Sequence, residues 1–281
     1  MKWNISWIVV LALCGGAALA QADGTPCAFD TNRMEFEGTP LQQARCLLRP
    51  VLRGGVLAKP LAVLPEPLEA SIGQPVAVTR DALRHYLQVH KISEGDIGGP
   101  ITNVLAAKYF IIHDTSTPNY GDKPFPPDIN QASWRLNNLD IWKKHPAAHI
   151  FVSRTGESLT AHQFIVPWRA TKFESKTLTH EQSRGLFVHV ENTMPRRSDP
   201  ARRAGNDAVA PEPGFTGPML DRLALLYLTA SLEHGRWMVP AYHAAVDAGI
   251  PDGHDDPQNF DLKLWAKRLG LLLKEVGQSP K

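Results

Sequence analysis

The segment KYFIIHDTSTPNYG, residues 108–121, gives the clearest indication of the fold. Its apolar run ends at His113 and is followed at once by Asp, Ser, Thr, Pro and Gly residues, which favour turns and loops. A short apolar run bounded by turn residues is typical of a buried strand. We therefore expect a rigid strand that carries His113 to its end, beside a loop.

Strand and helix patterns alternate after Ile101. A strand is predicted at 103–113 and, further along the chain, a helix at 131–144, a strand and turn at 147–158, a strand at 185–192, and helices at 220–235 and 260–276. This alternation predicts an α/β fold with a central mixed β-sheet flanked by helices. The Pro- and Gly-rich stretch 194–217, which carries four arginines, is interpreted as a long surface loop that borders a site.

The chain before residue 101 has a different character. Residues 1–22 have the features of a secretory signal peptide, with Lys2, an apolar run at 5–20 and a small-x-small cleavage site at Ala18–Ala20. Residues 23–100 alternate short helical patterns with Pro-rich breaks, so we expect a mostly helical N-terminal extension in front of a domain at 101–281. The leader predicts a periplasmic or secreted protein. Lipid anchoring at Cys14 is disfavoured, because Leu13 precedes it where a small residue is usual.

The cysteines and the charge limit the possible surroundings and partners of the protein. Beyond the leader only Cys27 and Cys46 are present, and in an oxidising compartment they predict a disulfide, the alternative being two unpaired thiols. The formal net charge of +2 gives no indication of nucleic acid or of an anionic membrane as a partner. No second apolar run approaches the roughly 18 to 20 residues that a membrane span needs.

A metal site is indicated by the segment VPAYHAAVDAGIPDGHDDPQNFD, residues 239–261. Its Gly and Pro residues prevent a regular helix or strand, so the chain can fold back and bring His243 and Asp256 to one cation. His113 is the candidate for a third ligand. Two alternatives stay open: His113 as an ordinary core histidine with an Asp-Pro turn at Asp256, and Asp255 as the ligand in place of Asp256.

Five motifs occur in one order: FIIHDTST (110–117), HIFVSRTG (149–156), VHVEN (188–192), His243, and DDPQNFD (255–261). In content and order they resemble the zinc-dependent N-acetylmuramoyl-L-alanine amidases of the type 2 amidase and peptidoglycan recognition protein superfamily, over about residues 105–275. The resemblance implies a type 2 amidase-like fold. It also implies Zn²⁺ held by His113, His243 and Asp256, and a catalytic glutamate on the strand at 185–192.

The chain departs from the pattern of this family at three places. His254 stands two residues before the final ligand, where lysine or threonine is common, and it can stabilise an oxyanion. The family's Trp-His-Ala-Gly segment corresponds to WRATK, so Trp168 and Arg169 are the expected substrate contacts. The catalytic position falls on Glu191 when Glu is aligned with Glu, and on His189 after a shift of two. We take Glu191 as the general base and His189 as a substrate contact on the same strand face.

The expected function is hydrolysis of the amide between N-acetylmuramic acid and the L-alanine of the stem peptide, outside the cytoplasm. Three protein ligands leave a fourth position for a water whose proton Glu191 would accept. The expected partners are peptidoglycan or muropeptides. Two alternatives are a peptidoglycan-binding protein on the same fold that no longer cleaves, and a secreted zinc hydrolase of another amide.

Overall fold

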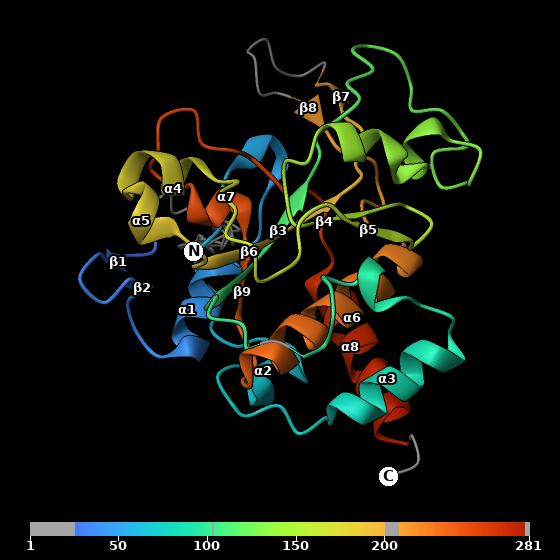
Figure 1. Cartoon of the computed structure of the whole chain (residues 1–281). Helices are drawn as coiled ribbons and strands as arrows, with labels where there is room; N and C mark the ends of the chain where they lie inside the picture. The colour runs from blue at the N-terminus through green and yellow to red at the C-terminus, as the bar shows by residue number, and fades with distance from the viewer. Residues whose placement is uncertain (1–25, 103, 200–207, 279–281) are drawn as a thin grey trace, which may run out of the picture.

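A five-stranded mixed sheet lies at the centre of the computed structural model, which describes residues 26–102, 104–199 and 208–278 (Figure 1). In spatial order its strands are β5 (Ser158–Thr160), β4 (Ile150–Val152), β6 (Phe187–Asn192), β3 (Tyr109–Asp114) and β9 (Val239–Tyr242). The last four strands are parallel and β5 pairs antiparallel with β4. The predicted α/β fold with a central mixed sheet is therefore confirmed. The predicted leader, including Cys14, lies outside the described residues.

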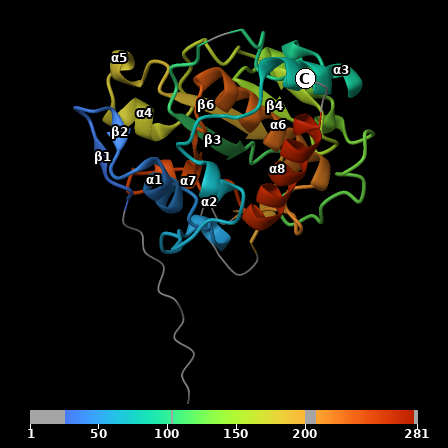
Figure 2. The same cartoon turned by 90° about the horizontal axis from the view of Figure 1, so that it is seen from below.

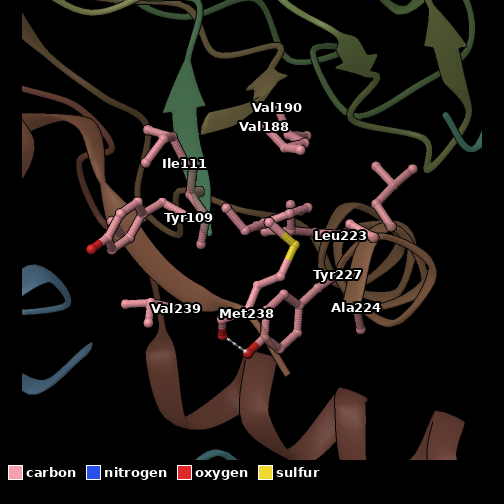
Figure 3. Packing of buried hydrophobic residues seen from close by; sticks show 14 of the residues in the cluster. Tyr109, Ile111, Val188, Val190, Leu223, Ala224, Tyr227, Met238 and Val239 are labelled. Carbon is pink, nitrogen blue, oxygen red and sulfur yellow. Dashed lines mark hydrogen bonds between the residues drawn. The ribbon is translucent and has the colours of Figure 1, made fainter. Parts of the chain in front are cut away.

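One face of the sheet is covered by the long helix α6 (Gly217–His234), and α8 (Leu262–Gly277) packs against α6. Val188 and Val190 point from β6 toward Leu223 of α6 (Figure 3). The Tyr227 hydroxyl donates a hydrogen bond to the carbonyl oxygen of Met238, 2.7 Å away, which ties α6 to the chain entering β9. As predicted, α6 ends at Gly235, whose φ of 83° lies in the left-handed region that favours glycine.

The opposite face carries α1 (Pro40–Leu47), α4 (Lys172–Thr177) and α7 (His243–Val246), whereas α6 and α8 lie on the other side of the sheet (Figure 2). Here Phe173 of α4 packs against Phe36 and Phe187. The Phe36 backbone N–H donates to the Tyr109 hydroxyl over 2.7 Å. Part of the predicted extension therefore lies on the sheet face from which His113 projects.

The region 26–100 contains the expected short helices, α1, α2 (Leu68–Ser71) and α3 (Arg80–Val89), together with the small hairpin of β1 (Phe29–Asp30) and β2 (Glu35–Phe36) and the 3₁₀ turns η1 (Arg53–Gly55) and η2 (Glu94–Asp96). Thr39 and Thr79 cap α1 and α3, each accepting a hydrogen bond from a backbone N–H three residues later. The predicted disulfide between Cys27 and Cys46 is present. No helix in the described ranges is both long and apolar enough to cross a membrane.

The predicted helix at 131–144 is wrong. The chain there forms two 3₁₀ segments, η3 (Arg135–Asn137) and η4 (Leu139–Lys144). The Asn137 side chain donates to the carbonyl oxygens of Ile129 and Gln131 and accepts from the backbone N–H of Arg154. Asparagine side chains that bond to nearby backbone compete with regular helix, and here they fold the segment into a turn.

The stretch 194–217 is less open than predicted. It contains a two-strand ribbon, β7 (Arg197–Ser198) paired with β8 (Ala208–Val209). The short helix α5 (His180–Ser183) lies outside this stretch, before β6. Arg196 is buried, not solvated, and its Nη2 donates to Oδ2 of Asp114 over 2.8 Å. This buried pair fixes the loop to the end of β3, directly beside His113.

Candidate metal centre

The predicted site residues meet at the carboxyl ends of three neighbouring parallel strands. His113 of β3 is in register with Glu191 of β6, so both project from the same face of the sheet. On the other side of β3, Ile112 is in register with Tyr242, the last residue of β9, and His243 follows it as the first residue of α7. Figure 1 shows α7 and α4 beside these strand ends. Polar sites commonly form at this edge of an α/β sheet.

Three buried side chains converge there. Nδ1 of His113 lies 2.8 Å from Nδ1 of His243, which lies 3.0 Å from Oδ1 of Asp256. The third separation, from His113 Nδ1 to Asp256 Oδ2, is 3.9 Å. The ligand atoms of all three residues lie within 4.8 Å of one another, and their N, N and O donors can hold a metal ion. The backbone N–H of Asp114 donates to Asp256 and helps to fix the carboxylate.

The far side of each imidazole is also occupied. Nε2 of His113 lies 3.0 Å from Nδ1 of His189, and Nε2 of His243 lies 3.1 Å from Oδ2 of Asp247. The His243–Asp247 contact is close enough for an ion pair, although the ring N–H is not aligned as in a hydrogen bond. Asp247 is held by the backbone N–H of Phe173, 2.8 Å from its Oδ1. Histidines that bind metals usually have such an outer partner, which orients the ring.

The charges at the site suit a cation. Burial, together with the neighbouring His243 and His189, holds the pKa of His113 well below its usual range. Burial alone would lower the pKa of His243 as well, but the Asp256 and Asp247 carboxylates raise it to about 10. A protonated His243 therefore supplies the positive charge between two buried carboxylates. A metal ion would compete with the His243 proton for that place, because metal ligands must be deprotonated.

Glu191 lies on the side of the His113 ring where Nδ1 of His113 faces Nδ1 of His243. Its Oε1 is 3.9 Å from His113 Nδ1, and its side chain is 16% exposed, more than the side chains of His113, His243 and Asp256. Within the described part of the chain, Oε2 has no hydrogen-bond partner. Burial, with the nearby Asp256 adding to it, raises the pKa of Glu191 well above its usual value. A buried carboxylate oxygen without a partner, beside a candidate metal, can accept a hydrogen bond or a proton from a water at that place.

His189 projects from the same face of β6 as Glu191, as predicted, but it lies on the other side of the His113 ring. It is completely buried, with Nδ1 against His113 and Nε2 3.2 Å from Oε2 of Glu174. The geometry therefore gives no support to His189 as a substrate contact. It also separates the two alternatives for the catalytic position, because Glu191 faces the inward edge of the His113 ring and His189 the outward edge.

His254 borders the site from the surface. Its side chain is 49% exposed, and its ring lies over that of His243 with centroids 4.3 Å apart. Its Nδ1 is 3.2 Å from Oδ2 of Asp247. His243, Asp247 and His254 thus form a second group whose ligand atoms lie within 4.8 Å of one another. Asp247 contacts Nε2 of His243, whereas Asp256 contacts Nδ1. The second group therefore lies on the outer side of the His243 ring.

Trp168 and Arg169 line a separate cavity of about 540 Å³, together with Val166, Pro167, His180 and Arg184. The Trp168 ring stacks on His162 at 3.9 Å, and its Nε1 donates to the carbonyl oxygen of Ala147. Thr171, three residues after Trp168, caps α4 and contacts Glu174, which in turn contacts His189. The WRATK segment therefore connects this cavity to the metal-binding group.

Two buried groups at the site were not predicted from the sequence as contributors. Glu174 was not singled out, although the T-x-x-E pattern at 171–174 is a recognisable capping box. Arg196 was assigned to a solvated loop, and no local pattern indicates its pairing with Asp114. Asp255, the alternative ligand, points to Nε2 of Gln258 and is not part of either metal-binding group.

Comparisons with known proteins do not place the chain in a family. No protein-family model matches it, and no curated protein is significantly similar to it in sequence.

Proposed function

We propose that the protein is an exported zinc-dependent amidase with a type 2 amidase-like fold, which hydrolyses the amide between N-acetylmuramic acid and L-alanine in peptidoglycan. The observation that carries the proposal is the convergence of His113, His243 and Asp256 with the unpartnered carboxylate of Glu191 on the same side. The Cys27–Cys46 disulfide is consistent with an extracellular location, where peptidoglycan lies.

Zinc is the cation that we assign to His113, His243 and Asp256. Two imidazoles and one carboxylate are a usual zinc ligand set, and three protein ligands are typical of catalytic zinc. Bound zinc supplies a water of lowered pKa, about 7, and polarises a carbonyl oxygen. The three ligands are almost completely buried and Glu191 is partly exposed, so we infer that the substrate approaches from the side of Glu191.

Glu191 acts in the proposal as the general base and then as the general acid. Its carboxylate accepts a proton from the attacking water and passes it to the departing amine nitrogen, which leaves poorly unless it is protonated. The raised pKa of Glu191 favours holding the proton between these two steps, and the positive charge of a bound cation opposes that shift. His254, half exposed beside His243, can donate to the oxygen that becomes negative during the attack.

The substrate is proposed to extend along the WRATK segment. The cavity at Trp168 and Arg169 offers an aromatic ring and the cationic side chains of Arg169 and Arg184. Aromatic faces suit sugar rings, and guanidinium groups bind carboxylates of the kind that a stem peptide carries.

The test is incubation of the zinc-loaded protein with purified peptidoglycan and with defined muropeptides, with the products followed by mass spectrometry. We expect free stem peptides with an L-alanine amino terminus, and their loss in His243→Ala and Glu191→Gln. A wild-type protein that binds muropeptide and one zinc but releases nothing would instead be a binding protein. Release from another amide alone would make it a zinc hydrolase of a different substrate.

A further inference from the structure

We propose that Glu174 and His189 are positioning residues that set the tautomer of His113, so that the His113 Nδ1 lone pair points at the metal site. This inference deepens the proposed function and rests on its ligand set. It assigns a task to two buried polar residues that neither bind the metal nor reach the substrate in the proposal above.

The three residues form a line from α4 through β6 to β3. Nδ1 of His189 lies 3.0 Å from Nε2 of His113, within hydrogen-bond distance. Oε2 of Glu174 lies 3.2 Å from Nε2 of His189, close enough for an ion pair, although the ring N–H is not aligned as in a hydrogen bond. All three side chains are completely buried. The register of the two parallel strands places His189 opposite Ile111, one step behind His113 on the same face. The line is therefore built into the sheet and does not depend on a flexible loop.

Glu174 can only be an acceptor in this line. It is the third residue of a capping box, in which its Oε2 accepts from the backbone N–H of Thr171, the backbone N–H of Ala170 and the Thr171 hydroxyl, each at 3.0 Å. An oxygen that faces three donors acts as an acceptor. The nitrogen of His189 that faces this oxygen must then carry a proton, because a ring lone pair there would be repelled.

The proton positions in the other rings follow. With one proton per ring, a proton on Nε2 of His189 leaves its Nδ1 as an acceptor. Nδ1 of His189 then accepts a hydrogen bond from Nε2–H of His113. The proton of His113 is therefore on Nε2, and the lone pair on its Nδ1 faces His243 and Asp256. The other end of the line is compatible with this assignment, because Nδ1 of His243 lies 2.8 Å from Nδ1 of His113 and can donate a hydrogen bond to its lone pair. All donors therefore point in one direction, toward Glu174.

The neighbouring His149 is not part of this line. Its Nε2 lies 3.0 Å from the carbonyl oxygen of Val166, and its Nδ1 accepts from the backbone N–H of His189. Its ring stacks on that of His189 with centroids 5.6 Å apart. His149 therefore supports the strand and the ring position of His189, while Glu174 alone supplies the charge that gives the line its direction.

The first measurement needs neither metal nor substrate. Ring ¹⁵N–¹H correlation spectra of the metal-free, ¹⁵N-histidine-labelled protein report which nitrogen of His113 carries the proton. We expect the Nε2–H tautomer in the wild type and a mixture of tautomers in Glu174→Gln. The matched control is Glu233→Gln, which replaces a buried carboxyl group on the other face of the sheet by an amide and is expected to leave His113 unchanged. A His113 ring protonated at Nδ1 in the wild type would overturn the proposal.

The second measurement is the affinity for Zn²⁺ in competition with a chelator. We expect His189→Leu to weaken binding by about 10- to 100-fold, the usual cost of losing an outer partner of a metal-bound histidine. His189→Gln, whose amide oxygen can accept from His113 and whose amide N–H can donate to Glu174, should restore most of the affinity. Equal losses in His189→Leu and His189→Gln, or folded Glu174→Gln with an unchanged tautomer, would contradict the proposal. A wild type that binds no Zn²⁺ would refute the proposed function, and the tautomer measurement would still decide this inference.

Discussion

Glu191 and His189 are two residues apart on β6 and share a face, yet they meet opposite edges of the His113 ring. Glu191 approaches the inward nitrogen Nδ1, at 3.9 Å, and His189 approaches the outward nitrogen Nε2, at 3.0 Å. The sequence allows either residue at the catalytic position. What separates them is the ring between them, which divides the face into a side near the candidate metal and a side filled by Glu174.

Replacement of Glu191 by glutamine should separate binding from chemistry. The variant keeps the shape of the side chain and all three proposed ligands but removes the group that accepts the proton. We expect Zn²⁺ binding within a few-fold of wild type and a decrease in kcat of about 10²- to 10⁴-fold, the usual contribution of a general base. Glu181→Gln, on the exposed surface of α5, is the control. Full activity in Glu191→Gln would exclude it as the base.

The two adjacent aspartates should differ sharply in their effect on metal binding. Asp256 is buried with Oδ1 3.0 Å from His243 Nδ1, whereas Asp255 accepts from Gln258 and lies outside the group. We expect Asp256→Asn to lower the Zn²⁺ affinity by more than about 100-fold, the upper limit for losing an outer contact, and Asp255→Asn to lower it only a few-fold. Chelator competition measures both. The reverse order would make Asp255 the ligand.

At the scale of elements, the N-terminal extension touches the loop that carries Asp256, the proposed third ligand. Gly55, in η1, has a φ of 74°, and a Cβ there would lie 2.3 Å from the Cβ of Asp255. Pro26, the first residue that the structure describes, packs against Gly249 of the same loop. A Cβ added to Gly249 would lie 2.9 Å from Cγ of Pro26. The segment that holds Asp256 is therefore confined by the N-terminal region.

Gly55→Ala should disturb the metal loop as well as the backbone. Gly121→Ala is the matched control, because Gly121 also has a positive φ, 57°, but an added Cβ there meets no atom within 4 Å. Both variants should lose roughly 1 to 2 kcal/mol in free energy of unfolding, because alanine is disfavoured in the left-handed region. Only Gly55→Ala should also weaken Zn²⁺ binding, because the clash pushes Asp255 and with it Asp256. Urea unfolding and chelator competition measure the two effects, and equal zinc affinities would show that η1 does not brace the loop.

Features set by neighbouring residues could be predicted from the sequence, whereas features set by residues distant in the sequence could not. The strand ending at His113 and the helix ending at Gly235 are set by local patterns of apolar residues and by a glycine that the backbone needs, so both could be predicted. The convergence of His243 and Asp256 could be predicted because turn residues between them permit the chain to fold back. The 3₁₀ turns at 135–144 could not, since the Asn137 side chain is held in part by Arg154, far along the chain. The outer partners Glu174 and Arg196 are likewise defined by pairings across 15 to 82 residues.

For the whole molecule, one buried carboxyl group in α6 links stability to pH. Glu233 is 2% exposed, and neither of its carboxylate oxygens has a hydrogen-bond partner within the ranges that the structure describes. Burial raises its pKa from 4.5 to about 8, with Arg80 opposing the shift. The folded protein therefore holds this proton more tightly than the unfolded chain does. Below about pH 4.5 both states are protonated and the group costs nothing.

Between about pH 4.5 and 8 the unfolded chain releases the Glu233 proton while the folded protein retains it, so the free energy of unfolding falls as the pH rises. Glu233→Gln removes this dependence. At about 1.4 kcal/mol per pKa unit, the variant should be more stable than wild type by up to a few kcal/mol at pH 8, and by little at pH 5. Urea unfolding of the metal-free proteins at both pH values measures the difference, with the exposed Glu37→Gln as control. A stability difference that is the same at pH 5 and pH 8 would mean that Glu233 titrates normally in the folded protein, and that its burial is compensated by charge from Arg80.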